Sequence, residues 1–108
     1  MIPTYCMILT TTSSKAEADR LAVILVGEKL AACVQAIQIS STYTWQEELV
    51  SEAEWLLLIK TRSALYPQVE DALRKHHSYE TPEIVCVPIS AGSAPYLAWI
   101  DATTMDLS

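Results

Sequence analysis

Glycine is scarce in this sequence, and long apolar runs are missing from it. Two glycines and five prolines among 108 residues leave little room for flexible linkers. Hydrophobic residues make up 51% of the chain and charged residues 19%, which is typical of a compact globular protein. We therefore expect one domain that covers residues 1–108.

Positive charge is also in short supply. Seven Lys and Arg residues stand against 13 Asp and Glu residues, which gives a formal net charge of -6. Nucleic acid phosphates require a basic face, so we expect no nucleic-acid partner. The acidic surface is compatible with cations as partners, although most acidic surfaces are simply solvated.

Signals for export and membrane insertion are missing as well. The chain starts MIPTYCMILTTTSS, without the basic segment and long apolar stretch of a secretory signal. No run approaches the roughly 20 apolar residues that span a membrane. We therefore expect a cytoplasmic location and no membrane partner.

The three cysteines do not form a disulfide or zinc pattern. Cys6, Cys33 and Cys86 lie far apart, and no Cys-x-x-Cys occurs. Each has apolar neighbours in the sequence, so we expect three reduced and buried thiols.

Hydrophobic periodicity predicts four strands and three helices. The predicted strands cover residues 4–12, 32–46, 47–62 and 83–89, and the predicted helices cover residues 14 to about 30, about 66 to 76, and 93–100. This β-α-β-β-α-β order with a short terminal helix predicts an α+β, ferredoxin-like fold. Such a fold has an antiparallel four-stranded sheet with both long helices on one face.

The first helix has a clear start signal. Ser14 followed by Glu17 predicts a capping box, in which each side chain accepts a hydrogen bond from the other residue's backbone N–H. Lys15, Glu17 and Arg20 are expected mostly on the solvent side of this helix. The second helix is expected to bury a stripe made of Val69, Ala72, Leu73 and His76.

The segment EWLLLIKT, residues 54–61, places apolar side chains on both faces of its predicted strand. Alternation along the strand points Leu57 and Ile59 one way, with Trp55, and points Leu56 and Leu58 the other way. Two helices cover only one face, and leaving roughly five large side chains wet would forgo roughly 1.5–3 kcal/mol each. We therefore predict a homo-oligomer. The alternative is a long hairpin that folds back over this face within one chain.

Four segments occur in one order along the chain: EKLAACVQAIQISSTYTWQ, EWLLLIKT, HHSYETPEI and PISAGSAPYLAWI. Together they resemble the CutA family of divalent-cation tolerance proteins over about residues 9–100. The resemblance implies a ferredoxin-like subunit in a tight homotrimer, similar in architecture to PII signalling proteins, with the sheets of three subunits facing one another. It also implies a role in tolerance of divalent metal ions, copper above all.

The sequence departs from the family pattern at four positions. Gln35 replaces the usual Asn, and Ser78 replaces the Pro of a His-Pro-Tyr-Glu motif. Glu47 replaces the Gly of a Trp-x-Gly turn, and Glu adopts a positive φ only at a cost, so the expected hairpin turn at residues 46–48 lacks its usual residue. Some family members carry, at the position of Thr10, a Cys that is linked to copper binding.

His76 and His77 are the candidate metal ligands, because imidazole suits copper, zinc and nickel. Adjacent side chains point about 100° apart on a helix and about 180° apart on a strand. One ion therefore reaches both rings only in an irregular turn or between symmetry-related copies. The alternative is that His76 completes the buried stripe and both rings interact with the helix C-terminus.

A second candidate site would bind a cofactor or small ligand. Its residues are Lys60, Tyr79, Glu80 and Trp45, with Glu83 and Trp99 in reserve. The strand that ends near Lys60 and the loop before Glu83 could approach one another, also across a subunit boundary. A lysine beside carboxylates and aromatic rings could bind a small anionic or amphipathic ligand. The alternative is an ion pair that satisfies a half-buried lysine at an interface.

Motifs for catalysis are missing from the sequence. There is no nucleophile elbow, no phosphate-binding Gly-rich loop and no Cys-His spacing of a known kind. We therefore predict a non-enzymatic homotrimer that binds or responds to copper or another divalent metal ion. Two alternatives stay open: a PII-like module that binds a small ligand in inter-subunit clefts and reports to a partner protein, and a structural trimer that anchors other proteins.

Overall fold

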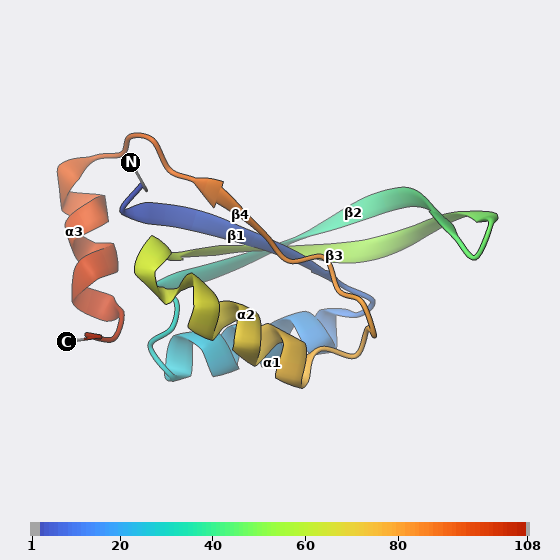
Figure 1. Ribbon diagram of the computed structural model, residues 1–108, viewed down its shortest axis with the longest axis horizontal. Coiled ribbons are helices and arrows are strands. Elements are labelled where there is room, and N and C mark those ends of the chain that lie inside the picture. The colour runs from blue at the N-terminus through green and yellow to red at the C-terminus, as the bar shows by residue number, and fades with distance from the viewer. Residues whose placement is uncertain (1–2, 108) are drawn as a thin grey trace.

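The structure, a computed structural model, describes residues 3–107. Its strands are β1 (Tyr5–Thr12), β2 (Cys33–Trp45), β3 (Glu48–Arg62) and β4 (Val85–Pro88). Its helices are α1 (Lys15–Gly27), α2 (Tyr66–His76) and α3 (Ala94–Thr103), and a 3-10 turn, η1 (Ser63–Leu65), precedes α2 (Figure 1). All seven predicted elements are confirmed. The main difference in their bounds is that α1 ends at Gly27, before the predicted end near residue 30.

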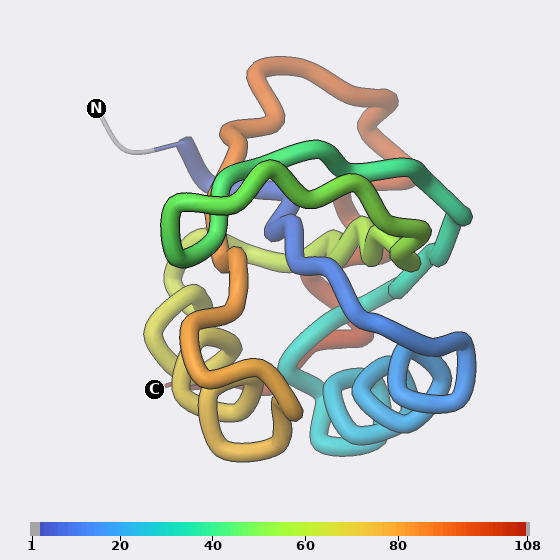
Figure 2. Tube along the Cα trace, turned by 90° about the vertical axis from the view of Figure 1, so that its right-hand side faces the viewer, coloured from blue at the N-terminus to red at the C-terminus, as the bar shows by residue number. Residues whose placement is uncertain are grey.

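The four strands form one antiparallel sheet in the order β2-β3-β1-β4. Helices α1 and α2 lie side by side against one face of this sheet (Figure 2), and α3 lies at one end of it (Figure 1). The predicted α+β, ferredoxin-like arrangement is confirmed. We call the face opposite α1 and α2 the helix-free face.

The core lies between the sheet and the two long helices. Leu57 and Ile59 of β3 are 0% exposed there, and they pack with Ile8, Leu21, Leu25, Val69 and Leu73. Leu56 and Leu58 lie on the helix-free face and are only half-buried, so the alternation predicted for this strand is confirmed. One chain therefore leaves an apolar sheet face partly uncovered.

The far end of the β2–β3 hairpin, residues 40–53, projects beyond the rest of the sheet, and we call it the arm (Figure 1). It is two-stranded because β1 pairs with β3 only as far as Trp55. The arm follows the longest axis of the molecule, which measures 44 Å against 25 and 21 Å for the other two. The hairpin therefore does not fold back over the helix-free face, as the alternative to an oligomer required.

The turn of this hairpin forms where it was expected, although it contains no glycine. The pairing of Trp45 with Glu48 leaves two residues to close it. Gln46 and Glu47 have φ values of 51° and 68°, the positive values that a type I′ turn requires at both central positions. Asn and Gly favour this geometry, so the turn holds two side chains in a left-handed conformation at an energetic cost.

Helix α1 begins as predicted, but Glu17 does not complete the capping box. The Ser14 side chain accepts a hydrogen bond from the backbone N–H of Glu17 at 3.1 Å. The Glu17 carboxylate instead accepts hydrogen bonds from the backbone N–H and the hydroxyl of Ser78, at 2.7 and 2.8 Å. Its expected place on the solvent side is also wrong, because Glu17 is only 7% exposed. A partner 61 residues away explains the difference.

The three cysteines are free thiols in different environments. Cys6 is buried, Cys33 is half-buried and Cys86 is exposed on the edge strand β4. The expected burial therefore holds for Cys6 and is wrong for Cys86, because an edge strand has a neighbour on one side only. Burial, followed by a contact with Cys86, raises the pKa of the Cys6 thiol to about 12, so this thiol stays protonated at neutral pH.

Candidate functional site

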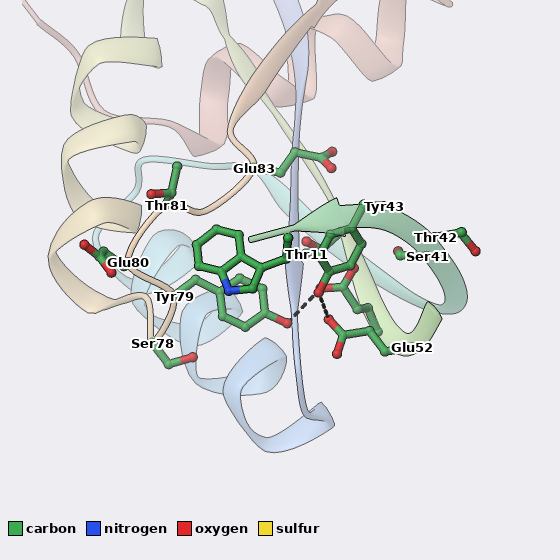
Figure 3. Close-up of a pocket in the computed structure, with 12 residues that line it drawn as sticks. Thr11, Ser41, Thr42, Tyr43, Glu52, Ser78, Tyr79, Glu80, Thr81 and Glu83 are labelled. Carbon is green, nitrogen blue, oxygen red and sulfur yellow. Dashed lines mark hydrogen bonds between the residues drawn. The ribbon is translucent and has the colours of Figure 1, made fainter. Parts of the chain in front are cut away.

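A hollow of about 710 Å³ lies between the arm and the segment that joins α2 to β4 (Figure 3). Its aromatic lining consists of Tyr43, Trp45 and Tyr79. Its acidic lining consists of Glu52, Glu54, Glu80 and Glu83. The volume lies within the range of roughly 300–1,000 Å³ that is typical of small-molecule sites.

Two tyrosines in the hollow donate hydrogen bonds to two of its carboxylates. The Tyr43 hydroxyl lies 2.5 Å from Glu52 Oε1, and the Tyr79 hydroxyl lies 2.7 Å from Glu54 Oε2. The hydrogen bond to Glu52 raises the pKa of Tyr43 to about 12. Burial, followed by the hydrogen bond to Glu54, raises the pKa of Tyr79 above its ordinary value. Both phenols therefore remain donors at neutral pH.

His77 holds the start of the segment that carries Tyr79. Its side chain is 0% exposed, and its Nε2 lies 2.8 Å from the backbone oxygen of Thr11. Its Nδ1 accepts the backbone N–H of Tyr79 at 3.0 Å, which assigns the neutral ring with the proton on Nε2. Glu17 holds the next residue, Ser78, from helix α1. These contacts fix the wall of the hollow that faces the arm.

Both ring nitrogens of His77 are therefore used by the protein itself. His77 could bind a metal ion only if one of these two hydrogen bonds broke. His76 lies in a different place, in a smaller hollow beside Leu30 and Met105, and its backbone oxygen accepts a hydrogen bond from Arg20. Within residues 3–107, no cluster of three or more His, Cys, Asp or Glu side chains is placed to hold a metal ion. The metal role of the histidine pair stays a prediction.

The structure brings together most of the predicted ligand-binding residues but not Lys60. Trp45, Tyr79, Glu80 and the reserve residue Glu83 all line the hollow. The Lys60 ammonium instead lies 5.6 Å from the ring centroid of Tyr96 in α3. The second reserve residue, Trp99, belongs to this other group, with its ring 5.6 Å from that of Tyr96. A role for Lys60 beside Tyr79 stays a prediction that would require a second subunit.

The sequence analysis missed Tyr43, Glu52 and Glu54 as site residues. The hairpin register could have indicated them. Pairing of Trp45 with Glu48 places Tyr43 opposite Val50, so Glu52 is the diagonal neighbour of Tyr43 on the same face of the hairpin.

No helix in the described part of the chain is long and apolar enough to cross a membrane.

Comparison with known proteins agrees with the fold and the motifs. Residues 6–103 match the family model of the CutA1 divalent ion tolerance protein. The divalent-cation tolerance protein CutA of Thermus thermophilus is 39% identical over 99 residues, which cover 91% of this chain and 96% of that protein. The crystal structure of CutA1 from Shewanella sp. SIB1 has a TM-score of 0.94 at 36% identity, and the match covers 98% of this chain and 100% of that one.

A third relative is described with a location. The structure of CutA from Archaeoglobus fulgidus, described as a periplasmic divalent cation tolerance protein, has a TM-score of 0.90 at 38% identity, covering 92% of this chain and 97% of that one. Fold and sequence thus define a ferredoxin-like protein of the CutA1 type. The chain belongs to the CutA1 divalent ion tolerance protein family, and the predicted resemblance is confirmed.

Proposed function

We propose that this chain acts in tolerance of divalent metal ions as a non-enzymatic homotrimer of single-domain subunits, with copper as the principal ion. We further propose a cytoplasmic location. Family membership supports the role in metal tolerance. The observation that carries the oligomer is the uncovered apolar surface of the single subunit.

This uncovered surface includes both the helix-free face and the arm. Ile37, Val85 and Val87 are 49%, 45% and 37% exposed, and all three lie on the helix-free face by the pairing register. In the arm, Leu49 is 79% exposed. Full burial of such a side chain contributes roughly 1.5–3 kcal/mol, so covering the remaining exposed parts supplies a driving force for assembly. Three copies with facing sheets would cover this surface.

Light scattering after size-exclusion chromatography at low micromolar concentration tests the assembly. We expect a mass about three times that of the 12.0 kDa chain. The Ile37→Glu variant places a charge on the helix-free face and is expected to lower the mass. Val23→Glu is the matched control, because Val23 is 72% exposed on helix α1, away from that face. A wild-type mass of one chain would contradict the proposal.

The proposed metal ligands are His76 and His77. Calorimetric titration with Cu²⁺ and Zn²⁺ compares the wild type with His76→Ala and His77→Ala variants. We expect the larger loss of affinity from His76→Ala, because the His77 ring already makes two hydrogen bonds. Equal affinity in the wild type and both variants would remove the pair from the metal site.

A second candidate function is supported by the hollow beside the arm. In this proposal the chain is a PII-like module that binds a small ligand with Trp45, Tyr79 and Glu80 and reports to a partner protein. The size of the hollow and the ordered wall formed by residues 77–79 favour it. Thermal stabilisation by a metabolite panel without added metal tests this function. No shift with any compound would count against it.

A further inference from the structure

Glu54 is a buried carboxylate without a positive partner among residues 3–107. It is 6% exposed, and within the described part of the chain it makes one hydrogen bond, which Oε2 accepts from the Tyr79 hydroxyl. Among residues 3–107, no Lys, Arg or His side chain forms an ion pair with it. Thr10 Oγ1 is the one side-chain polar atom within residues 3–107 that is both buried and unpaired, so the second oxygen of Glu54 is accessible to a ligand. The charged form of a carboxylate in such a largely buried place is favoured by a nearby cation.

The surroundings of Glu54 do not supply that cation. The residues that line the hollow include three more carboxylates and no basic side chain within the described part of the chain. Glu52 lies on the same strand and, like Glu54, accepts a hydrogen bond from a tyrosine hydroxyl, in this case that of Tyr43. Each of these two carboxylates keeps its second oxygen free of any hydrogen bond within residues 3–107. The hollow therefore offers negative charge to whatever enters it.

The remaining wall of the hollow combines aromatic rings with Ser and Thr side chains. Figure 3 shows the Tyr43 and Tyr79 hydroxyls directed toward one another, while the Glu80 side chain points away from them. Trp45 adds an indole that is 52% exposed. Aromatic faces attract organic cations that lie within about 6 Å of the ring centroid. The aromatic rings and the carboxylates of the hollow thus both favour an organic cation as the ligand.

A bare metal ion fits this site poorly. The volume of about 710 Å³ far exceeds the space that one ion occupies, and no cluster of three ligand side chains is found within residues 3–107. We propose that the hollow binds an organic ammonium ion, whose charge lies beside Glu54 and Glu52 and whose carbon skeleton packs on Tyr43, Tyr79 and Trp45. This inference rests on the second candidate function, ligand binding in the hollow, and names the class of ligand.

The test is a calorimetric titration of the assembled protein with compounds that differ in charge. The cationic probes are choline and spermidine. The matched controls for choline are 3,3-dimethyl-1-butanol, which replaces the charged nitrogen by carbon, and the anion 3,3-dimethylbutanoate. We expect at least one cationic probe to bind about tenfold or more tightly than both controls, and this binding to weaken as salt is added.

Substitutions locate the binding to the hollow. Glu54→Gln keeps an oxygen for the Tyr79 hydroxyl but removes the charge, and we expect about tenfold weaker binding of the cation. Glu52→Gln, at an exposed position, is expected to act in the same direction if the first variant folds poorly. Glu28→Gln makes the same change of net charge at an exposed position of α1's C-cap and is expected to leave the affinity unchanged.

The outcomes separate this inference from the function on which it rests. Binding of 3,3-dimethylbutanoate without choline or spermidine would overturn the ligand class and leave ligand binding in place. No binding of any probe, together with no thermal shift from the metabolite panel, would overturn both. Cation binding that is equal in the wild type, Glu54→Gln and Glu52→Gln would also overturn the inference.

Discussion

Strands β2 and β3 pass through two different environments along their length. Where they lie over α1 and α2, Leu57 and Ile59 are 0% exposed and packing holds the strands. In the arm, Leu49 is 79% exposed, and cross-strand hydrogen bonds such as Thr42 to Ser51 at 2.8 Å are the visible contacts. An isolated two-stranded hairpin is marginally stable in water. The comparison therefore indicates that packing on the helices stabilises the covered half within one chain, whereas the arm depends on a neighbour.

The largest expected effect is a cavity in the covered half. Leu57→Ala is expected to destabilise the protein by about 2–5 kcal/mol, because the removed atoms are fully buried. Leu49→Ala in the arm is the control, with both substitutions made in the Ile37→Glu background, where assembly is weakened; there its expected cost is below about 1 kcal/mol for an exposed position. Urea unfolding at one fixed protein concentration measures both. Equal costs would show that the arm is packed as tightly as the core.

The next largest effect is expected for the contact between helix α1 and Ser78, in the segment that forms a wall of the hollow beside the arm. Glu17→Ala removes the acceptor of two Ser78 hydrogen bonds and is expected to cost about 1.5–3 kcal/mol. It is also expected to speed amide hydrogen exchange at Ser78 and Tyr79. Ser78→Ala removes only the hydroxyl bond and is expected to cost less. Unchanged exchange in Glu17→Ala would mean that His77 alone holds this segment.

A substitution in the turn of the arm is expected to stabilise the protein. Glu47→Gly is expected to stabilise the hairpin by about 1 kcal/mol, because Gly accepts the positive φ of 68° without strain. Glu48→Gly, one residue on and within β3, is expected to destabilise by roughly 0.5–1 kcal/mol. Urea unfolding again measures the difference. Destabilisation by Glu47→Gly would argue against the two-residue turn.

The smallest expected effect is a proton equilibrium in the arm. The pKa of Tyr43 is raised from 10.0 to about 12, so the folded state holds this proton more tightly than the unfolded state. Its contribution to stability is complete below pH 10 and is lost as the pH rises toward 12. The phenolate absorbance difference between the wild type and Tyr43→Phe measures this titration. Glu52→Gln is expected to return the pKa of Tyr43 toward 10. An unchanged pKa would show that the hydrogen bond to Glu52 does not cause the shift.

Local patterns were sufficient to predict the elements of this fold. The change from strand to helix periodicity after Thr12, and the apolar residues on both faces of β3, were visible in the sequence and are confirmed. The Glu17 partner was missed because Ser78 follows it by 61 residues. In the site, Trp45, Tyr79 and Glu80 were predicted from motifs and line one hollow. Tyr43, Glu52 and Glu54 could be found only once the hairpin register was known.

Thr10 lies opposite Leu57 in the pairing of β1 with β3, on the same face as Ile8, and it is 0% exposed. Its hydroxyl is a buried side-chain polar atom that lacks a hydrogen-bond partner within the described residues. A thiol at this place would be sealed beneath the helices, so an incoming ion could reach it only after the interior opened. The rate at which a metal ion binds a thiol at position 10 would thus depend on how often the interior opens, rather than on the affinity of the thiol for the ion.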